Sequence, residues 1–408
     1  MARLCGEGAA VMSVLRGVEE GLRPRDLPPS RLREPLAGFP PVERVLTLGK
    51  AAAGLAHAAQ RAFGPLPGLS YGVRGGGAPP AGWVRLEGDH PAPTPENAAS
   101  TAEVRRWLES GRGPVLVLVS GGSSALLVEP VSPWELGEKA DLLSALLRRG
   151  ASIGEVNAVR VRLSRVKGGG LLSSVGDWPV ATGIWSDVAA GAEAMTGSGP
   201  TLPWSSGRAA EAVLRRYGLR PHRPLPPPVP RRGASEARTF VLARALDLRR
   251  SLARRLRSQG FSVAEAAVPE GLPAEELAGL LAERWRPSAG GGRRRALVGA
   301  GEAPVAAPAG GGAGGRCSHL AAAVALALQR RGKERWAFAA LATDGADGTG
   351  DGGAFTCFRC APPSPLLEEA LGRGDTATLW RRAGGAVPRG PTGNNLRDLW
   401  ALVETEGP

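Results

Sequence analysis

The sequence is poor in lysine, asparagine, histidine and cysteine. Lysine occurs only four times in 408 residues, at positions 50, 139, 167 and 333, so arginine supplies nearly all of the formal net charge of +13. The arginines are spread over the whole chain, and no compact basic stripe with interleaved aromatic residues occurs. The charge therefore does not predict a nucleic-acid partner. It predicts attraction of small anionic substrates.

Disulfides, a zinc cluster and membrane spans are also not expected. Four cysteines in a chain of this size form no disulfide framework, and Cys357 and Cys360 make a lone Cys-X-X-Cys without a second pair. The N-terminus reads as an amphipathic helix without an apolar signal core. No apolar stretch approaches the roughly 20 residues that a spanning helix needs. We expect a cytoplasmic protein that does not bind membranes.

The chain is too long for one ordinary domain, and its pattern is that of an α/β protein. Apolar runs closed by glycine alternate with helical patterns, which predicts α/β domains with mainly parallel, buried sheets. The proline-rich segment 219–232 is the predicted boundary, giving domains 1–225 and 226–408, with the last helix packing on the first domain as an open alternative. The predicted strands are 44–49, 114–122, 179–186, 238–243, 295–302 and 335–345, and the predicted helices are 50–63, 95–110, 132–149, 205–217, 243–259, 273–286 and 317–330.

Three aspartates lie in "LATDGADGTGDGGA", residues 341–354. The spacing of Asp344, Asp347 and Asp351 would suit a helix face, but five glycines make a helix costly, at up to about 1 kcal/mol each. The pattern is not that of an EF-hand, which needs acids at loop positions 1, 3 and 5. It predicts a loop after a strand. The loop is either a solvated turn or a segment that meets a metal or a phosphorylated ligand at the end of a sheet.

Further glycine loops, each with one or two polar residues, mostly follow predicted strands. In "TLGKAAAGLA", Lys50 stands at a helix start, where it can meet an anion. In "VLVLVSGGSSALL", the residues 120–124 can form an anion cradle. Each loop also has a non-functional interpretation: Lys50 can be an exposed lysine, and residues 120–124 can be a serine-capped helix start without a ligand. Together with the loops that carry Asp187, Glu302 and Arg316, they predict a phosphoryl-transfer site, which needs cations, carboxylates and flexible backbone.

The whole set resembles the glycerate 2-kinase family, whose C-terminal part is called the MOFRL domain. The family pattern runs GKAA, G-[GD]-H-P, SGG-x-SAL, N-x-V-R-x-x-LS-x-x-KGG, SDV, SGPT, GGET-x-V, GGR-NQE, TDG-x-DG and GPTGTN-x-x-D. This chain carries nearly all of these motifs in order, from residue 49 to residue 398. Each motif is weak alone, but the ordered set is specific.

The resemblance implies a Rossmann-like N-terminal domain and a MOFRL-type C-terminal domain around a deep cleft, with ATP and Mg²⁺ as cofactors and D-glycerate as substrate. The implied product is 2-phosphoglycerate. Lys50, Asp187 and Arg316 match the catalytic positions, and Asp187, Asp344 and Asp347 are the implied metal ligands. A homodimer is one open assembly. The substrate- or nucleotide-binding residues that the resemblance implies are Ser120, Gly121, Gly122, Ser123, Ser124, Asn157, Arg160, Lys167, Glu302 and Asn395.

The chain departs from the family pattern at four places, one of which is the change of GPTGTN to "GPTGNN". After the Ser-Asp-Val motif the family continues with Gly-Asp-Asp, where this chain has Ala190, Gly191 and Ala192. Asn-Gln-Glu after GGR is replaced by residues 317–319, Cys-Ser-His, and GGET-x-V is reduced to "AGEAPV". A diverged homologue that binds nucleotide or glycerate without turnover is therefore the alternative function. A hydroxypyruvate reductase is a third, although G-x-G-x-x-G behind a strand is missing.

Overall fold

The computed structural model describes residues 6–202, 209–227, 234–266, 269, 271–288, 292–305, 312–348, 351–388 and 390–406. The chain separates into two compact units. The N-terminal unit is Pro24–Leu242. The C-terminal unit combines Ala243–Pro408 with the first segment, Met1–Arg23.

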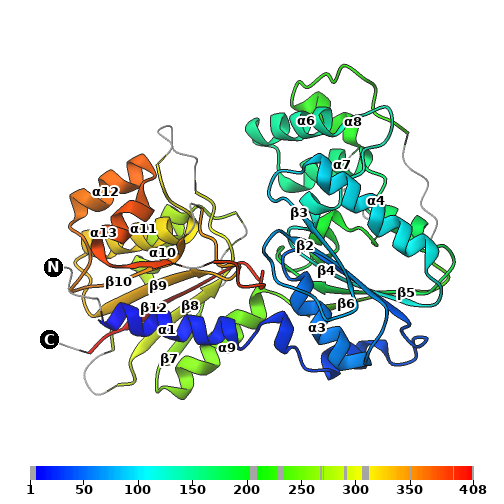
Figure 1. The fold of residues 1–408 in the computed structure, drawn as a ribbon. Helices are drawn as coiled ribbons and strands as arrows, with labels where there is room; N and C mark the ends of the chain where they lie inside the picture. The colour runs from blue at the N-terminus through cyan, green and yellow to red at the C-terminus, as the bar shows by residue number, and fades with distance from the viewer. Residues whose placement is uncertain are drawn as a thin grey trace. The chain divides into compact units, whose positions relative to one another are not determined.

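A six-stranded sheet forms the centre of the N-terminal unit (Figure 1). Its strands lie in the order β3-β2-β1-β4-β5-β6, and the pairs from β3 to β5 are all parallel. β1, β4 and β5 are buried at every residue, because both faces of a parallel sheet are covered. The bounds are β1 Arg44–Leu48, β2 Gly68–Val73, β3 Val84–Gly88, β4 Val115–Ser120, β5 Val180–Trp185 and β6 Ala237–Ala243.

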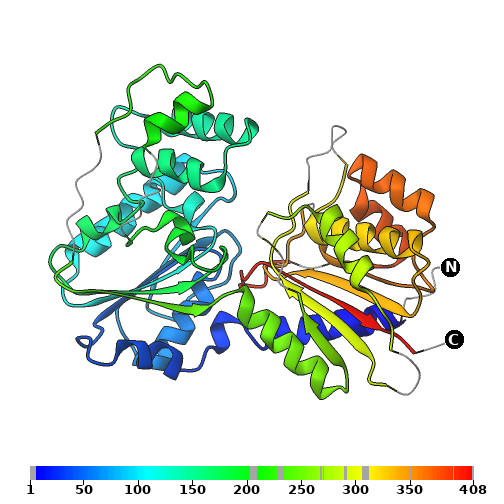
Figure 2. The ribbon, with the colours of Figure 1, turned by 180° about the vertical axis from the view of Figure 1, so that it is seen from behind.

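Helices cover both faces of this sheet, with α3 on one face and α4 on the other (Figures 1 and 2). Three further helices, α6, α7 and α8, pack on one another around a separate apolar cluster that includes Trp134 and Leu146. α7 begins at a capping box in which Ser152 and Glu155 satisfy each other's backbone N–H. The bounds are α2 Ser30–Arg33, α3 Ala52–Phe63, α4 Pro95–Ser110, α5 Ser123–Leu126, α6 Leu136–Arg148, α7 Ile153–Arg162 and α8 Ala210–Arg216.

The C-terminal unit has a second six-stranded sheet, in the order β11-β10-β9-β12-β8-β7. β7, β8, β9 and β11 run in one direction, and β10 and β12 run in the other, so only β7 and β8 are parallel neighbours. The bounds are β7 Ser262–Glu265, β8 Arg295–Ala300, β9 Trp336–Ala342, β10 Asp351–Cys357, β11 Ala386–Pro388 and β12 Asp398–Glu404.

Helices also cover both faces of the second sheet (Figures 1 and 2). α1 and α9 lie on one face, and α10 to α13 lie on the other. α11 is the central helix of this layer and is buried at eleven positions between Cys317 and Leu328. The bounds are α1 Gly6–Glu20, α9 Ala245–Ser258, α10 Ala274–Arg284, α11 Arg316–Arg330, α12 Ser364–Arg373 and α13 Thr376–Ala383. Among the described residues, no helix combines the length and the apolar character needed to cross a bilayer.

The prediction of a two-domain α/β fold with helix-flanked sheets is confirmed, and each predicted strand and helix has a counterpart among the described residues. Residues 205–208 of the predicted helix 205–217 lie outside the described residues. The second sheet contains more antiparallel pairing than its strand patterns indicated. β12 inserts between β8 and β9 and is buried at all seven residues, so it reads as an apolar run whose direction the sequence does not reveal. The last element is therefore this strand, and not a helix that packs on the first domain.

The division into units differs from the predicted boundary at residue 225. The proline-rich segment lies inside the N-terminal unit, where Leu219 and Leu225 pack on the α6–α8 cluster and Trp134 Nε1 donates to Pro224 O at 3.1 Å. Residues 228–232 of that segment lie outside the described residues. At the other end, α1 belongs to the C-terminal unit because its apolar side, including Leu15 and Val18, is buried on the second sheet.

Candidate functional site

Lys50 lies at the point where the strand order of the first sheet reverses. The chain leaves β1 through α3 toward β2, whereas β4 lies on the other side of β1. Ligands of open α/β sheets bind at the carboxyl ends of strands at such a switch point. Lys50 follows β1, and the Ser-Gly-Gly-Ser-Ser loop begins at the last residue of β4. Fold topology therefore places the first two predicted loops where a ligand is expected.

Contacts join these two loops closely. Lys50 N donates to Gly121 O at 2.9 Å, and Ser120 Oγ donates to Leu48 O at 2.9 Å while accepting from Ala51 N at 3.1 Å. Gly122 has φ +84°, and a Cβ added there would lie 2.9 Å from Lys50 Cγ. The aliphatic part of the Lys50 side chain thus packs against a position that only glycine suits.

A polar network continues from this loop into α7. Ser124 Oγ and Ser198 Oγ are 2.7 Å apart, and Ser198 Oγ donates to Asn157 Oδ1 at 3.2 Å. Arg160 also bonds Asn157 Oδ1, and Lys167 Nζ donates to Ser124 O at 2.7 Å. The structure therefore joins Ser124 of the serine–glycine loop to the predicted residues of the next motif, Asn157, Arg160 and Lys167, in one network.

Three cations of this region are withdrawn from water. Lys139 on α6 and Lys167 are 3% and 1% exposed, and Lys139 Nζ donates to Leu163 O at 3.0 Å. Burial, aided by the charge of Arg160, lowers the pKa of Lys139 from 10.5 to about 7. Burial and the two neighbouring cations lower the pKa of Lys167 well below its usual value, and burial lowers that of Arg160 to about 10. An anion bound among them would favour their charged forms.

Asp187 lies two residues beyond β5 and is half-buried. β5 is the parallel neighbour of β4, with Ser120 paired to Trp185, so Asp187 is on the same edge of the sheet as the serine loop. The departures Ala190 and Gly191 are exposed in the loop that follows. Glu193, which opens a 3-10 helix at Glu193–Ser198, is the next acid along the chain. This loop can contribute one or two carboxylates to a ligand.

Arg316 is the centre of the second group of predicted residues, in the C-terminal unit. It is the first residue of α11, and its Nε and Nη2 donate to the two carboxylate oxygens of Asp398 at 2.8 and 3.2 Å. Nη2 also lies 3.0 Å from Glu302 Oε1. The charge of Asp398 raises the pKa of Arg316 above its usual value, because this effect is larger than the opposing effect of burial. Arg316 is therefore a permanently charged group of fixed orientation.

The three aspartates of the glycine-rich loop have three different environments. Asp344 is half-buried and accepts from Ala346 N at 3.1 Å in a tight turn. Asp347 is 2% exposed, and its two carboxylate oxygens accept from Cys317 N and Ser318 N, each at 2.8 Å. Asp351 is the first residue of β10 and forms an ion pair with Arg381 at 2.9 Å. These contacts make Asp347 a helix cap, so we do not retain it as a metal ligand.

The Gly-Pro-Thr-Gly-Asn-Asn segment lies over this turn. Thr392 N donates to Asp344 O at 3.3 Å, and Thr392 Oγ1 donates to Thr343 O at 2.5 Å. The amide of Asn394 donates to Glu19 and to Leu22 O of the N-terminal segment. Asn395, the predicted binding residue, is 7% exposed and donates its N–H to Asn394 Oδ1 at 2.8 Å. The described contacts of both asparagines hold the loop in shape.

The replaced residues at 317–319 face the interior of the unit. Cys317 is 1% exposed, and burial raises the pKa of its thiol. Ser318 Oγ accepts from Gly315 N at 2.8 Å, and His319 Nε2 lies 2.6 Å from Glu275 Oε1. These side chains serve the packing and capping of α11, so their change from the family pattern alters the interior more than the Arg316 edge.

Sequence reasoning missed three residues of these networks, namely Lys139, Ser198 and Asp398. Each had a signal: Lys139 is one of four lysines, Ser198 lies in the Ser-Gly-Pro-Thr motif, and Asp398 closes the last family motif. In the described part of the chain, no three His, Cys, Asp or Glu side chains are grouped so as to hold a metal ion. Asp187 and Asp344 are both half-buried carboxylates, and Mg²⁺ commonly takes one or two carboxylates with phosphates and waters.

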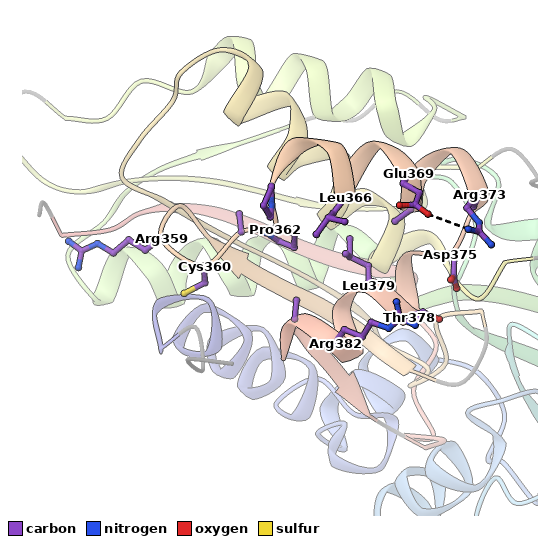
Figure 3. A pocket seen from close by; sticks show the side chains of 14 residues that line it. Arg359, Cys360, Pro362, Leu366, Glu369, Arg373, Asp375, Thr378, Leu379 and Arg382 are labelled. Atoms are coloured by element: carbon purple, nitrogen blue, oxygen red, sulfur yellow. Dashed lines mark hydrogen bonds and ion pairs between the residues drawn. The ribbon is translucent and has the colours of Figure 1, made fainter. Parts of the chain in front are cut away.

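A hollow of about 820 Å³ lies elsewhere in the C-terminal unit, between α12, α13 and the turn after β10 (Figure 3). Its lining mixes apolar residues such as Leu366 and Leu379 with Arg359, Arg373 and Arg382. Arg373 is paired with Glu369 at 3.2 Å. None of the site residues predicted from the sequence lines this hollow.

An α/β protein with cations and glycine loops at the carboxyl ends of its strands has the parts of a phosphate-binding site, as small-molecule kinases do. Residues 37–231 match the model of a domain of unknown function (DUF4147), and residues 295–398 match the MOFRL family. The chain belongs to the glycerate kinase family with a MOFRL domain, as the resemblance predicted.

Similar proteins carry two kinds of name, glycerate kinase and hydroxypyruvate reductase. A D-glycerate 2-kinase of Thermotoga maritima is 30% identical over 77% of this chain and 78% of its own length. A solved glycerate kinase structure from Thermotoga maritima matches with a TM-score of 0.81 and 27% identity, covering 97% of this chain and 98% of that one. A protein of Agrobacterium vitis, named provisionally as a hydroxypyruvate reductase, is 33% identical over 88% of this chain and 86% of its own length.

Proposed function

We propose that the protein transfers the γ-phosphoryl group of ATP to the 2-hydroxyl of D-glycerate, with Mg²⁺ as cofactor, and releases ADP and 2-phosphoglycerate. The observation that carries the proposal is the packing of Lys50 against the Ser-Gly-Gly-Ser-Ser loop at the switch point of the first sheet. A strand-end lysine beside glycines and hydroxyls is suited to an anionic phosphoryl group. Because the reaction consumes ATP, we propose a cytoplasmic location for the protein.

The buried cations support the same reaction. Phosphoryl transfer is catalysed mainly by positioning and by charge stabilisation. Arg160 and Lys167 lie beside Ser124 and Asn157, where polar donors surround a strongly cationic region. We assign this network to phosphate oxygens of the nucleotide. Lys50 and Arg316 are the cations assigned to the transferring group or to the glycerate carboxylate.

Asp187 is the proposed general base. The 2-hydroxyl oxygen would form the new P–O bond while the bond from Pγ to the bridging oxygen of ADP breaks, and the hydroxyl proton would pass to the carboxylate. Asp187 is half-buried on the strand edge that also carries the serine loop. Mg²⁺, when bound, would neutralise the phosphate charge, and Asp344 is the predicted metal ligand that we retain for it.

Product analysis tests this proposal. The purified protein is incubated with ATP, Mg²⁺ and D-glycerate, ADP formation is followed, and the product is identified by phosphorus NMR against 2- and 3-phosphoglycerate. Formation of 2-phosphoglycerate supports the assignment, and 3-phosphoglycerate would refute the 2-position. No ADP together with saturable nucleotide binding would favour the diverged, non-catalytic homologue.

The name of the Agrobacterium vitis relative favours a second candidate, reduction of hydroxypyruvate with a nicotinamide cofactor. G-x-G-x-x-G occurs at residues 310–315, ten residues beyond the end of β8, and at residues 348–353, which run into β10 and not into a helix. Neither stands directly between a strand and a helix, as a dinucleotide site requires, which argues against this candidate. The test is consumption of NADH or NADPH in the presence of hydroxypyruvate, measured on the same preparation. Turnover there without ADP formation would replace the kinase assignment.

A further inference from the structure

The guanidinium of Arg316 is held along one edge by a carboxylate of its own unit. Asp398 binds Nε at 2.8 Å and Nη2 at 3.2 Å, so the pair is bidentate. The Asp398 side chain is 7% exposed and that of Arg316 is 38% exposed. Nη1 takes part in neither bond. A bidentate pair fixes the plane of the guanidinium as well as its position, so Asp398 determines how the remaining edge is presented.

The backbone from which Arg316 extends is held by a second carboxylate. The N-cap of α11 is Gly315, which has no side chain to cap the helix. Asp347, some thirty residues further along the chain, accepts from the N–H groups of Cys317 and Ser318 instead. These are two of the four N–H groups that a helix start leaves without an intrahelical partner. The first turn of α11 therefore depends on the glycine-rich loop after β9.

Close packing between two glycine segments maintains this contact. A Cβ added at Gly315 would lie 2.3 Å from Asp347 Oδ1, and a Cβ added at Gly348 would lie 1.9 Å from Gly314 O. Gly348 also has φ +65°. Any side chain at either position would separate the loop from the helix start. The Gly-Gly-Arg motif at residues 314–316 and the Asp-Gly motif at residues 347–348 thus pack directly against each other.

We propose that Asp398 and Asp347 are positioning residues for Arg316: Asp398 orients its guanidinium directly, and Asp347 fixes the first turn of α11 that carries it. This inference rests on the proposed function only in taking the group bound by Arg316 to be the substrate carboxylate or the transferring phosphoryl group. It gives the second half of the Thr-Asp-Gly-Ala-Asp-Gly motif a role other than metal binding.

The structural part of the inference is tested without substrate. The Nε–H signal of Arg316 is observed by ¹⁵N-NMR on the whole protein and assigned with Arg316→Lys. We expect a sharp, slowly exchanging signal that is lost in Asp398→Asn and shifted or broadened in Asp347→Asn. Asp351→Asn is the matched control, because Asp351 belongs to the same loop but pairs with Arg381. A signal unchanged by Asp398→Asn or by Asp347→Asn would overturn the role of that residue.

The kinetic part uses the same variants with ATP, Mg²⁺ and D-glycerate. We expect kcat to fall by about 10²-fold in Asp398→Asn and in Asp347→Asn, the loss that a misplacement of about 1 Å can cause, with the Mg²⁺ requirement unchanged. Guanidinium ion should restore part of the activity of Arg316→Ala but not that of Arg316→Ala combined with Asp398→Asn. A weakened Mg²⁺ requirement in Asp347→Asn that excess metal restores would overturn positioning in favour of a metal ligand. An inactive wild type would refute the proposed function, whereas the NMR result would still decide the positioning.

Discussion

Replacing Lys139 by methionine should stabilise the ligand-free protein at neutral pH. Lys139 is fully enclosed between α6 and the end of α7, and its charge lies near those of Arg160 and Lys167. One pKa unit corresponds to about 1.4 kcal/mol, so a pKa lowered from 10.5 to about 7 means that the charged form costs the folded state roughly 5 kcal/mol. Methionine is of similar length, carries no charge and adapts to an irregular cavity.

The net gain is smaller than this cost. Lys139 Nζ donates to Leu163 O, and removal of that donor leaves a buried carbonyl unsatisfied at roughly 1–3 kcal/mol. We therefore expect Lys139→Met to raise the free energy of unfolding by roughly 2–4 kcal/mol near pH 7. The folded pKa lies below the unfolded one, so the unfolded state binds more protons between pH 7 and 10.5 and stability rises with pH across that window. The gain should accordingly shrink as the pH rises and become a small loss near pH 10.5, where folded Lys139 is neutral and the variant still lacks the hydrogen bond to Leu163 O.

Urea unfolding at pH 7 and pH 10, with and without inorganic phosphate or ATP, measures these effects. Lys333→Met is the control, because it removes a lysine from the other unit. If the buried cations bind an anion, phosphate or ATP should stabilise the wild type more than Lys139→Met, and more strongly at pH 7. A Lys139→Met protein that is less stable than wild type at pH 7, or a difference that does not change with pH, would refute the reasoning.

Three further outcomes can be checked by simple kinetics or unfolding. Lys50→Ala should lose turnover by about 10²-fold while its circular dichroism is unchanged, as for removal of one preorganised charge donor; wild-type kinetics would exclude Lys50 from the site. Asp344→Asn should lower activity in a way that excess Mg²⁺ or Mn²⁺ partly restores, and full activity without added metal would leave Asp344 as a turn residue. Gly348→Ala should lower the unfolding midpoint, since φ +65° and a contact at 1.9 Å both oppose a Cβ; an unchanged midpoint would contradict the packing described here.

Much of the first sheet could be predicted because buried parallel strands are apolar along their whole length. β4, "VLVLVS", is buried at all six residues and is followed at once by the glycines that bend the chain. β3, "VRLEG", is an edge strand with two exposed residues at its start and has no such pattern. Edge strands are partly solvated, and their sequences resemble loops. The residues that carry the site follow the buried strands, so the predictable part of the fold was also the part that positions Lys50 and Ser120.

The roles of individual polar residues were less predictable because they depend on partners far away in the chain. Asp344 and Asp347 are three residues apart in one glycine-rich loop, and nothing in the local pattern separates them. Asp347 is a cap only because α11 begins beside it, whereas Asp344 accepts from Ala346 N in a local turn. In the same way, the pKa of Lys139 is lowered because the folded chain buries its ammonium group and brings Arg160 near it.

These long-range contacts also change how the departures from the family pattern are understood. The family acids absent after Asp187 are replaced in an exposed loop, whereas residues 317–319 point into the unit and maintain the helix that begins with Arg316. A loss of carboxylates at the first place alters what can bind there. A change at residues 317–319 is tolerated as long as the first turn of α11 keeps its cap. Because Asp347 caps that turn from the backbone side, the Arg316 edge does not depend on whether Asn-Gln-Glu or Cys-Ser-His follows it, and this chain can retain the family's cation after losing the neighbouring motif.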